Sequence, residues 1–234
     1  MNRKNQLTAL KGKLIVSCQA YEGEPLYGAD IMARIALAAK NGGAAAIRAN
    51  SPEDIRAIKA LSGLPVIGIW KKRYPDSEVY ITPALDDAIA VAEAGADIIA
   101  MDATDRKRPG GERLETIVEN VRKRFGGLLM ADISTADEAV RAERLGFDIV
   151  STTLSGYTAY SPKLSGPDFG LIADIVKRTS IPVFAEGRIR TPEEAARCLR
   201  EGAFAVVVGS AITRPEEIAK RFAEAVRESS ADPA

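Results

Sequence analysis

The sequence predicts a single-domain α/β protein over residues 1–234, folded as a closed (β/α)8 TIM barrel. Continuous apolar runs, typical of strands buried on both faces, alternate with amphipathic segments typical of helices. Eight such units fit within 234 residues, which is enough to close a barrel. The helix-to-strand junctions also carry glycines at near-equal intervals, namely Gly43, Gly95, Gly146 and Gly202. This regular spacing favours a closed ring over the alternative, a doubly wound open sheet.

The eight expected strands are the apolar runs, and the segments between them have helical periodicity. The runs are Leu14–Gln19, Ala44–Asn50, Pro65–Lys71, Asp97–Thr104, Leu128–Ser134, Asp148–Leu154, Pro182–Arg188 and Ala205–Gly209. Several helical segments open with Ser-Pro or Thr-Pro, which is typical of a cap followed by a first-turn proline. The four junction glycines are expected to end helices in the left-handed conformation that a side chain resists. The last residues, ESSADPA, are expected to fray.

The balance of charge excludes several classes of partner. The chain has 32 Lys and Arg against 32 Asp and Glu, so nucleic acid and anionic membranes gain no electrostatic attraction. No apolar run approaches the ~20 residues of a spanning helix, and the N-terminus lacks the apolar core of a signal peptide. Cys18 and Cys198 are too sparse for a disulfide framework and are expected to be buried packing residues. We therefore expect a cytoplasmic protein that binds neither nucleic acid nor membrane.

Histidine is absent from the chain. Its absence removes Ser–His and Cys–His nucleophilic catalysis, histidine general bases and the commonest ligand of transition metals. Acid–base chemistry therefore has to use Lys, Asp, Glu, Tyr or a water molecule.

The stretch over residues 182–215 predicts a phosphate site. It has the pattern strand, glycine turn, helix, strand, glycine turn, helix, with the turns at Gly187 and Gly209. Backbone N–H groups at these turns, and at the helix N-terminus that begins with Ser210, suit a dianionic phosphate. Loops after strands seven and eight are where such sites recur, so we expect a barrel of the phosphate-binding type. Arg214 is expected either to close over the phosphate or to be a surface arginine at a helix end.

Functional residues in this architecture lie at the carboxyl ends of the strands. Several charged residues here lie within the strands themselves, where burial is costly unless the groups are paired or functional. We therefore favour function for the set of polar residues at the strand ends. They are Gln19, Arg48, Asn50, Lys71, Lys72, Asp102, Asp132, Thr152, Thr153, Glu186, Arg188, Gly209 and Ser210.

Two adjacent lysines follow the third strand, and only one can face the barrel axis, because neighbouring strand residues point to opposite faces. Lys71 lies an even number of residues after the proline that begins its strand, and Glu186 does the same in strand seven. These two side chains therefore share a facing if the two prolines do. Lys72 is then expected at the rim, and Trp70 is expected to pack outward.

Strands three and seven face each other in a ring of eight, so Lys71 and Glu186 would flank whatever lies between them. With a phosphate anchored at strands seven and eight, a sugar would extend toward Lys71. A neutral lysine there could remove a proton beside a carbonyl group. The alternative is a structural ion pair between Lys71 and Asp102 of the neighbouring strand.

Two loops near the mouth carry weaker candidates. The run DRKRPGGER, residues 105–113, is expected to be a mobile and solvated loop after strand four. Tyr157 and Tyr160 are expected to line the loop over the substrate.

Several of these segments together closely resemble the N-acetylmannosamine-6-phosphate 2-epimerase family, also called N-acylglucosamine-6-phosphate 2-epimerase. The resemblance extends from residue 14 to about residue 215, so it covers nearly the whole chain. The segments that carry it are LIVSCQA, GGAAAIRAN, DSEVYITP, DATDRKRP, MADIST, STTLSGYT and VVGSAITRP.

The resemblance implies interconversion of N-acetylmannosamine 6-phosphate and N-acetylglucosamine 6-phosphate in sialic acid catabolism, without a metal or an organic cofactor. It implies that Lys71 carries the proton and that Glu186 is its catalytic partner. The implied substrate-binding residues are Gln19, Arg48 and Asp132 on the sugar, and Gly187, Gly209, Ser210 and Arg214 on the phosphate. Members of the family are often dimers, so a homodimer is also expected.

Three other functions stay open at this point. A related barrel could be a lyase or another isomerase acting on a sugar phosphate. A metal-dependent pentose-phosphate epimerase shares the barrel, although it relies on histidine ligands that this chain lacks. A non-catalytic phosphosugar-binding protein is the third, and it would leave the lysine and the carboxylate within the strands without a purpose.

Overall fold

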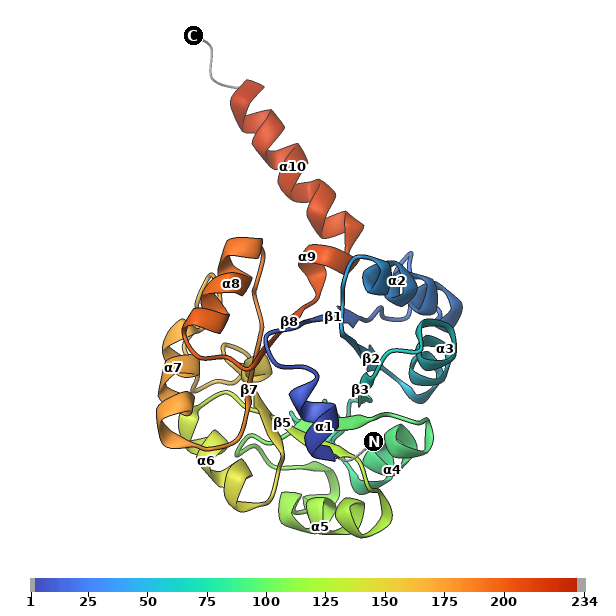
Figure 1. Cartoon of the computed structure of the whole chain (residues 1–234), viewed down its shortest axis with the longest axis vertical. Coiled ribbons are helices and arrows are strands. Elements are labelled where there is room, and N and C mark those ends of the chain that lie inside the picture. Colours follow the sequence, from blue (N-terminus) through green and yellow to red (C-terminus); the bar gives the residue numbers. More distant parts are fainter. Residues whose placement is uncertain (1–2, 231–234) are drawn as a thin grey trace.

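A computed structural model describes residues 3–230, and in it eight parallel strands close into a barrel in sequence order. Helices surround the barrel (Figure 1). The strands are β1 (Leu14–Cys18), β2 (Ala46–Asn50), β3 (Val66–Ile69), β4 (Ile98–Asp102), β5 (Leu128–Asp132), β6 (Ile149–Ser151), β7 (Val183–Glu186) and β8 (Ala205–Val208). The closed order from β1 to β8 confirms the predicted barrel over the open sheet.

Each strand lies within its predicted run but is shorter than predicted. The difference is largest at β6, which was expected to reach Leu154 but ends at Ser151. The next three residues form a 3-10 turn, η2 (Thr152–Leu154), which carries the chain over the mouth of the barrel. Apolar content alone cannot separate a strand end from a buried turn, because both are covered by neighbouring elements.

The helices between the strands follow the predicted alternation. They are α2 (Ala29–Asn41), α3 (Pro52–Ser62), α4 (Leu85–Glu93), α5 (Leu114–Arg124), α6 (Ala136–Arg144), α7 (Phe169–Arg178) and α8 (Pro192–Arg200), with the 3-10 turn η1 (Pro109–Gly111) before α5. The junction glycines have φ angles between 83° and 101°, so they adopt the left-handed conformation expected at helix ends.

Two of the expected caps form as predicted. The Ser51 hydroxyl accepts a hydrogen bond from the Asp54 N–H at 3.2 Å, with proline at the first helical position. Thr191 accepts one from the Glu194 N–H at 3.2 Å, and the Glu194 carboxylate accepts one in return from the Thr191 N–H at 3.3 Å. This reciprocal arrangement satisfies two backbone donors that the helix itself leaves without a partner.

The core has two layers, one inside the barrel and one between the barrel and its helices. Alternate residues of each strand enter alternate layers; in β3, Ile67 and Ile69 point inward whereas Val66 packs outward. Gly68 also faces outward, where an added Cβ would lie 2.7 Å from the Ala96 Cβ and 2.8 Å from the Ile55 and Val91 side chains. The absence of a side chain at this position is what lets α3 and α4 approach β3 so closely.

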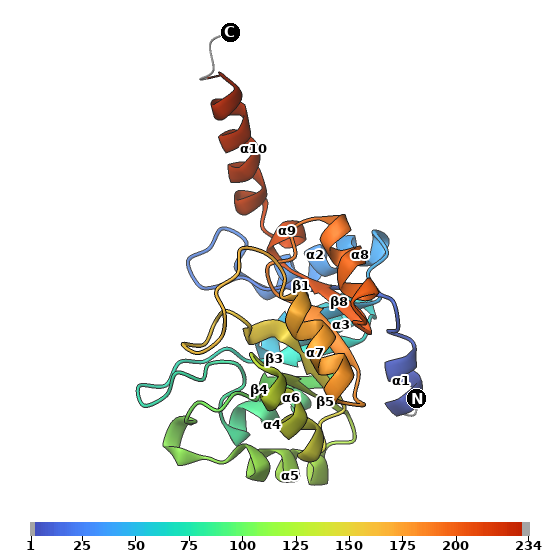
Figure 2. The same ribbon diagram turned by 90° about the vertical axis from the view of Figure 1, so that its left-hand side faces the viewer.

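A short N-terminal helix, α1 (Arg3–Thr8), lies at one end of the barrel. Leu7 and Leu10 pack against the interior layer, and Leu10 is buried. Figure 2 shows the loops that follow β1, β3 and β6 extending together on the opposite side of the molecule from α1. The mouth of the barrel, where the strands end, is therefore the end left accessible.

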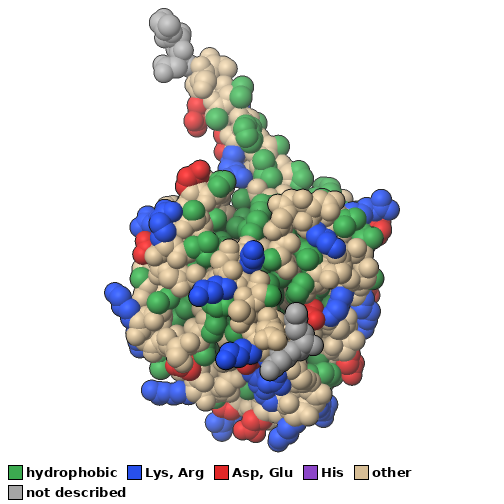
Figure 3. Space-filling model, viewed as in Figure 1, with side chains coloured by type: hydrophobic (Ala, Val, Ile, Leu, Met, Phe, Trp, Pro, Cys, Tyr) green, Lys and Arg blue, Asp and Glu red, His purple; other side chains and the backbone are tan. Residues whose placement is uncertain are grey.

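The chain continues after β8 into α9 (Ser210–Thr213) and α10 (Pro215–Ser230). Helix α10 projects away from the barrel and buries none of its residues (Figures 1 and 2). Hydrophobic side chains are visible along it in Figure 3, and Phe222 is 71% exposed. Residues 228–230, expected to fray, are helical here, whereas residues 231–234 lie outside the described part. No helix within residues 3–230 is long and apolar enough to cross a membrane.

The predictions for three packing side chains are confirmed. Cys18 and Cys198 are buried and free, and burial raises the pKa of their thiols to about 12 and about 11. Trp70 packs against the outer core layer, with the Lys72 Nζ lying 4.5 Å from its ring centroid.

Candidate active site

A cavity of about 670 Å³ opens at the mouth of the barrel. It brings together eight of the nine residues for which the sequence predicts a catalytic or substrate-binding role. Those eight are Gln19, Arg48, Lys71, Glu186, Gly187, Gly209, Ser210 and Arg214. The ninth, Asp132, does not line the cavity.

The strand register explains why Lys71 and Glu186 meet at this cavity. In β7, Phe184 points into the barrel, so Glu186 does as well. Ile69 points inward at the end of β3, and Lys71 continues that alternation. The Lys71 N–H donates to the Asn50 Oδ1 at 2.7 Å, which holds this backbone against β2 beyond the last residue of β3. Lys72 points elsewhere and pairs with Asp87 at 2.8 Å, so the predicted assignment of the two lysines agrees with the structure.

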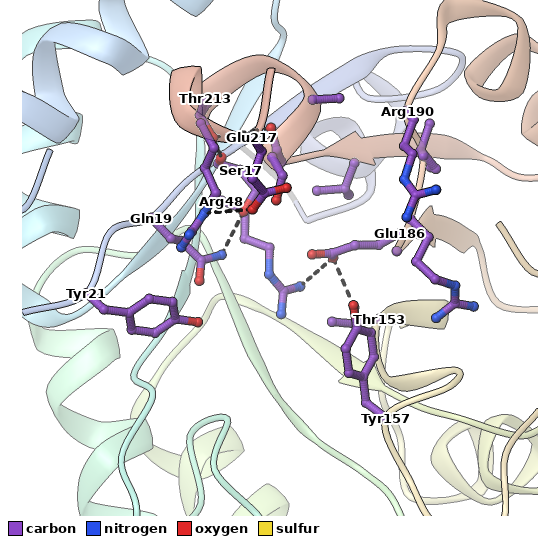
Figure 4. A pocket seen from close by; sticks show the side chains of 18 of the residues that line it. Ser17, Gln19, Tyr21, Arg48, Thr153, Tyr157, Glu186, Arg190, Thr213 and Glu217 are labelled. Carbon is purple, nitrogen blue, oxygen red and sulfur yellow. Dashed lines mark hydrogen bonds and ion pairs between the residues drawn. The ribbon is translucent and has the colours of Figure 1, made fainter. Parts of the chain in front are cut away.

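The floor of the cavity is a buried cluster of Arg48, Asp132, Thr153 and Glu186, which we call the floor cluster. The Arg48 guanidinium binds the Asp132 carboxylate through two hydrogen bonds of 3.1 and 2.5 Å. It also contacts the Glu186 Oε2 at 3.0 Å. The Thr153 hydroxyl lies 2.9 Å from the Asp132 Oδ1. It also lies 2.9 Å from the Glu186 Oε2 (Figure 4). One cation and one hydroxyl thus hold two carboxylates side by side.

Burial decides the electrostatics of the floor cluster. The Arg48 side chain is 1% exposed, that of Asp132 is 0% and that of Glu186 is 13%. Burial raises the pKa of the Glu186 carboxyl; Arg48 opposes this effect, and the charge of Asp132 adds to it. Burial acts to lower the pKa of Arg48, but the charges of Asp132 and Glu186 outweigh it and raise that pKa. Because two carboxylates share one guanidinium, Glu186 is the group that holds a proton more readily than a free glutamate.

Asp132 lies beneath Arg48, where its two oxygens are occupied by Arg48 and Thr153. The sequence predicted a contact between Asp132 and the sugar, whereas in this structure Asp132 reaches the cavity only through these two neighbours. Two other buried polar atoms at the floor have no hydrogen-bond partner among the described residues, the Gln19 Oε1 and the Arg48 Nε. One is an acceptor and the other a donor, and each lacks the partner that a buried polar atom normally has.

A second group, the rim cluster, consists of Tyr21, Glu24, Lys71 and Arg214. The Lys71 Nζ donates to the Tyr21 hydroxyl at 2.7 Å. The Arg214 guanidinium binds both oxygens of Glu24, at 2.9 and 3.2 Å. The Tyr21 N–H donates to the Glu24 Oε2 at 2.8 Å, which links the two pairs. The rim cluster is more exposed than the floor cluster, since the Arg214 and Glu24 side chains are 29% and 31% exposed.

The two glycine turns reach the cavity as the sequence predicted. Gly187 has a φ of 110°, a conformation that side chains avoid, and it directly follows Glu186. Gly209 precedes α9, of which Ser210 is the first residue. Within α9 the Ile212 and Thr213 N–H groups donate to the Gly209 oxygen at 2.8 and 3.0 Å, which leaves the N–H groups of Ser210 and Ala211 to meet an anion.

The structural ion pair considered for Lys71 is wrong. Asp102 instead pairs with Arg106 at 2.6 Å and accepts hydrogen bonds from Thr104. The prediction of a solvated loop over residues 105–113 holds in part: most of these residues are exposed, but Arg108 is buried and donates to the backbone oxygens of Pro83 and Asp102. Burial lowers the pKa of the Arg108 guanidinium. Arg106 and Arg108 thus fold back onto the ends of the strands, whereas Asp105, Lys107, Glu112 and Arg113 are exposed.

The loop between β6 and α7 meets the prediction in part. Tyr157 lines the cavity, but Tyr160 does not, because its hydroxyl donates to the Glu138 Oε1 at 2.6 Å. Arg188 fastens this loop by donating to the backbone oxygens of Gly166 and Ser155. Its guanidinium lies 5.8 Å from the Tyr157 ring centroid. Arg188 thereby positions Tyr157 beside the cavity.

The sequence reasoning missed the contribution of the first loop. Ser17, Gln19 and Tyr21 all line the cavity, because alternate residues keep the same facing beyond the end of β1. That alternation was readable in the sequence and would have pointed to Tyr21. Glu24 had no comparable signal, since it reaches Arg214 only after the chain has turned. Among residues 3–230, no group of three or more Asp, Glu or Cys side chains could hold a metal ion.

Comparison with known proteins shows that this chain matches one family along most of its length. A family model described as "Putative N-acetylmannosamine-6-phosphate epimerase" matches residues 32–228. A relative from Enterobacter sp. (strain 638) is 55% identical over 232 residues, which cover 98% of this chain and 99% of that protein. A relative from Caldanaerobacter subterraneus subsp. tengcongensis is 54% identical over 220 residues, which cover 94% of this chain and 93% of that protein. Both carry the name "Putative N-acetylmannosamine-6-phosphate 2-epimerase".

A solved structure of the N-acetylmannosamine-6-phosphate 2-epimerase from Clostridium perfringens is similar with a TM-score of 0.92 and 52% identity. The match covers 94% of this chain and 95% of that chain. A thiamine phosphate pyrophosphorylase from Pyrococcus furiosus, with 21% identity and a TM-score of 0.61 over 92% of each chain, shares the fold alone. These findings confirm the resemblance found in the sequence: the chain belongs to the N-acetylmannosamine-6-phosphate epimerase family.

Proposed function

We propose that this protein interconverts N-acetylmannosamine 6-phosphate and N-acetylglucosamine 6-phosphate by removing and returning the hydrogen at C2 of the sugar. The observation that carries the proposal is the arrangement of Lys71 and Glu186 on one cavity that also holds two glycine turns and Arg214. The relatives of the family carry the name of this reaction, and one of them is a biochemically characterised enzyme that is 52% identical to this chain.

Lys71 is the proposed base. Opening the sugar ring to the aldehyde makes the C2–H bond acidic, because the resulting anion spreads onto oxygen. The amine at the end of β3 can take that proton when it is neutral, while buried donors stabilise the enolate. The Arg48 Nε, which has no acceptor among the described residues, is a candidate donor at the floor.

Glu186 is the proposed acid for the opposite face of C2. It lies on β7, across the barrel from β3, and its raised pKa favours a carboxyl group that carries a proton to give. In the reverse direction the same two groups exchange roles, since each finishes a turnover in the protonation state that the reverse reaction needs. Asp132 and Thr153 would support this role by holding Glu186 and Arg48 in place.

The phosphate is proposed to lie at the turns of Gly187 and Gly209, against the first residues of α9 and within reach of Arg214. All four positions line the same cavity. Gln19, whose buried Oε1 lacks a donor among the described residues, is proposed to accept a hydrogen bond from the sugar. The substrate would then extend from the turns across the floor cluster toward Lys71.

Incubation with N-acetylmannosamine 6-phosphate, followed by identification of the product by NMR, tests the proposal. In heavy water the product should carry deuterium at C2. The Glu186→Gln variant should no longer form the epimer, yet it should still exchange the C2 hydrogen of the one epimer that Lys71 can reach. Loss of both exchange and epimerisation would instead assign Glu186 to ring opening.

The same experiment separates the alternatives. A lyase would release a shorter product, which NMR distinguishes from an epimer. A non-catalytic phosphosugar-binding protein would bind the substrate and leave it unchanged. Full activity after prolonged treatment with a metal chelator is expected if the reaction uses side chains alone, and loss of activity would count against that prediction.

We also propose that the protein is a homodimer. The support is α10, on which Ile218, Phe222 and Val226 share one face at helical spacing; Ile218 is partly buried, whereas Phe222 and Val226 are 71% and 65% exposed. A second copy of the chain would cover that face. Sedimentation should give a dimer that dissociates in the Phe222→Glu variant. The cytoplasmic location and the lack of nucleic-acid binding remain predictions, which cell fractionation and a binding assay would test.

A further inference from the structure

The Arg214 guanidinium, proposed above as a phosphate ligand, is already engaged in the ligand-free protein. Both of its terminal nitrogens bind Glu24, at 2.9 and 3.2 Å, in the side-by-side geometry that guanidinium groups also use for phosphate. Its Nε lies 3.8 Å from the Glu217 Oε1. Glu24 is not among the residues that line the cavity. The two terminal nitrogens of Arg214 are therefore bound by the turn after β1 and not by a residue of the cavity wall.

The segment that carries Glu24 is built around this carboxylate. The Glu24 N–H donates to the Tyr21 backbone carbonyl oxygen at 2.9 Å, and the Tyr21 N–H donates to the Glu24 Oε2 at 2.8 Å. One carboxylate therefore both closes the turn after β1 and holds Arg214. Breaking the bond to Arg214 leaves the two hydrogen bonds within the turn but removes the contact that joins the turn to the residue after α9.

Tyr21 connects the turn to the proposed base. Its hydroxyl accepts a hydrogen bond from the Lys71 Nζ at 2.7 Å, and the Arg214 guanidinium lies 5.5 Å from its ring centroid. Figure 4 shows the Tyr21 side chain at the side of the cavity, pointing toward its centre. Glu24, Tyr21, Lys71 and Arg214 thus form one connected chain that extends from the phosphate end of the cavity to the reacting end.

We propose that Glu24 is a specificity residue: it occupies Arg214 as an internal anion that a phosphate dianion displaces and an uncharged sugar does not. Both are oxygen anions that match the guanidinium fork, but the phosphate carries more charge and more acceptor atoms. A neutral sugar offers no charge to replace the carboxylate, so it leaves the pair closed. The inference rests on the proposed function only in taking the anion to be that of a sugar phosphate.

The exchange also reaches Lys71. When Arg214 moves from Glu24 to the phosphate, the turn that positions Tyr21 loses its contact with Arg214, the residue that follows α9. The Lys71 Nζ is then released from the Tyr21 hydroxyl and can approach C2. Phosphate recognition thereby becomes a condition for the base to be free, which favours phosphorylated over unphosphorylated sugars beyond the contacts to the phosphate itself.

Calorimetric titration with inorganic phosphate tests the inference without turnover. In the wild type, protein molecules whose Arg214 is paired with Glu24 cannot bind phosphate through that arginine. The Glu24→Gln variant should therefore bind phosphate about 3- to 10-fold more tightly than the wild type. The Glu22→Gln variant removes the same charge from an exposed position in the same segment and should bind like the wild type. Equal affinity of Glu24→Gln and the wild type, or an equal gain in Glu22→Gln, would overturn the proposal.

Two further variants show whether the effect passes through Arg214. In the Arg214→Met background, adding Glu24→Gln should produce no gain in affinity, and a gain of the same size would contradict competition for this arginine. The Glu24→Asp variant keeps the charge but shortens the side chain, so it should also bind phosphate more tightly than the wild type. Wild-type affinity in Glu24→Asp would assign the effect to charge alone. Circular dichroism checks that each variant is folded.

Kinetics then separate this inference from the proposed function. With N-acetylmannosamine 6-phosphate, Glu24→Gln should lower KM by about the factor seen for inorganic phosphate and leave kcat close to the wild-type value. If no protein in the series turned over this sugar, the proposed function would fail, while the phosphate titration would still decide the role of Glu24. If the wild type were active and Glu24→Gln showed neither change, the epimerase would stand and this inference would fall.

Discussion

The cavity has two arginines that bind carboxylates, and they differ in burial, in the element that carries them and in the elements that supply their partners. Arg48 lies in the floor cluster, comes from a strand and is 1% exposed, whereas Arg214 lies in the rim cluster, follows a short helix and is 29% exposed. Arg48 is held by Asp132 and Glu186 from two other strands. Arg214 is held by Glu24 from a turn. The barrel thus sets the geometry at the floor, while the rim is held by contacts that a ligand can replace.

The contrast suggests a division of labour. A buried ion pair with strand partners cannot rearrange without leaving a charge uncompensated, so the floor suits the reacting part of a substrate. A partly exposed pair is weak and easily exchanged, so the rim suits recognition of an incoming anion. Four predictions follow from this comparison.

The largest effect is expected at Lys71, the member of the rim cluster that is the proposed base. Replacing Lys71 by Ala should reduce kcat/KM by about 10³, because a positioned acid–base group contributes on this scale. Lys72→Ala is the matched control, because that side chain points away from the cavity to Asp87 and should leave the rate near the wild-type value. A Lys71→Ala protein with wild-type activity would end the assignment of the base.

The floor cluster should respond to Arg48→Met with a loss of both stability and activity. The change leaves Asp132 and Glu186 buried without their cation, and breaking a buried pair in this way costs about 3–5 kcal/mol of unfolding free energy. Urea unfolding measures the loss. A stability close to that of the wild type would mean that the floor is less tightly coupled than its burial indicates.

The rim should respond to Arg214→Met in the opposite manner. Its pair with Glu24 is partly exposed, so the free energy of unfolding should change by no more than about 1 kcal/mol. The KM for the phosphorylated sugar should rise about 10- to 100-fold, which corresponds to losing a charged hydrogen-bond partner of the phosphate. Urea unfolding and steady-state kinetics on the same preparation measure both. A large loss of stability with an unchanged KM would make Arg214 a structural residue.

The smallest effect is expected in the pH dependence of kcat/KM, which should shift after a substitution in the floor cluster but not after one in the rim cluster. Because the pKa of the Glu186 carboxyl is raised, kcat/KM should fall with decreasing pH before the ordinary carboxyl value of about 4.3 is reached. In the proposed mechanism the Lys71–Glu186 pair holds one proton between its two groups, so a second proton, taken up by Glu186 at low pH, leaves neither group able to accept the proton from C2. The charge of Asp132 contributes to this raised pKa, so Asp132→Asn should move the acidic limb to lower pH.

Two comparisons keep that pH experiment interpretable. The ionisation of the substrate phosphate affects the wild type and Asp132→Asn equally, so the difference between the two profiles isolates the enzyme group. Glu24→Gln, at the rim, should leave the acidic limb in place. An acidic limb that does not respond to Asp132→Asn would show that Glu186 does not control it.

The sequence predicted which charged residues form the floor cluster, but it did not predict how they are arranged. Arg48, Asp132 and Glu186 stood out because charge inside an apolar strand is costly without a purpose. Their order in depth was not readable, because it depends on which carboxylate the guanidinium covers. Asp132 therefore lies below Arg48 rather than against the cavity. The rim was predicted less well, since Glu24 has no strand to set its facing.

The sequence by itself determined the closed barrel, the positions of its strands, the facing of Lys71 and Glu186, and the two glycine turns that reach the cavity. All of these follow from local periodicity and from residues whose backbone preferences do not depend on distant neighbours. Only the tertiary structure decided that Asp102 binds Arg106 rather than Lys71, that Arg108 is buried, and that Arg214 meets Glu24. Each of these contacts forms where a loop folds back onto the barrel, so its partners are set by the path of the loop rather than by the periodicity of a strand or a helix.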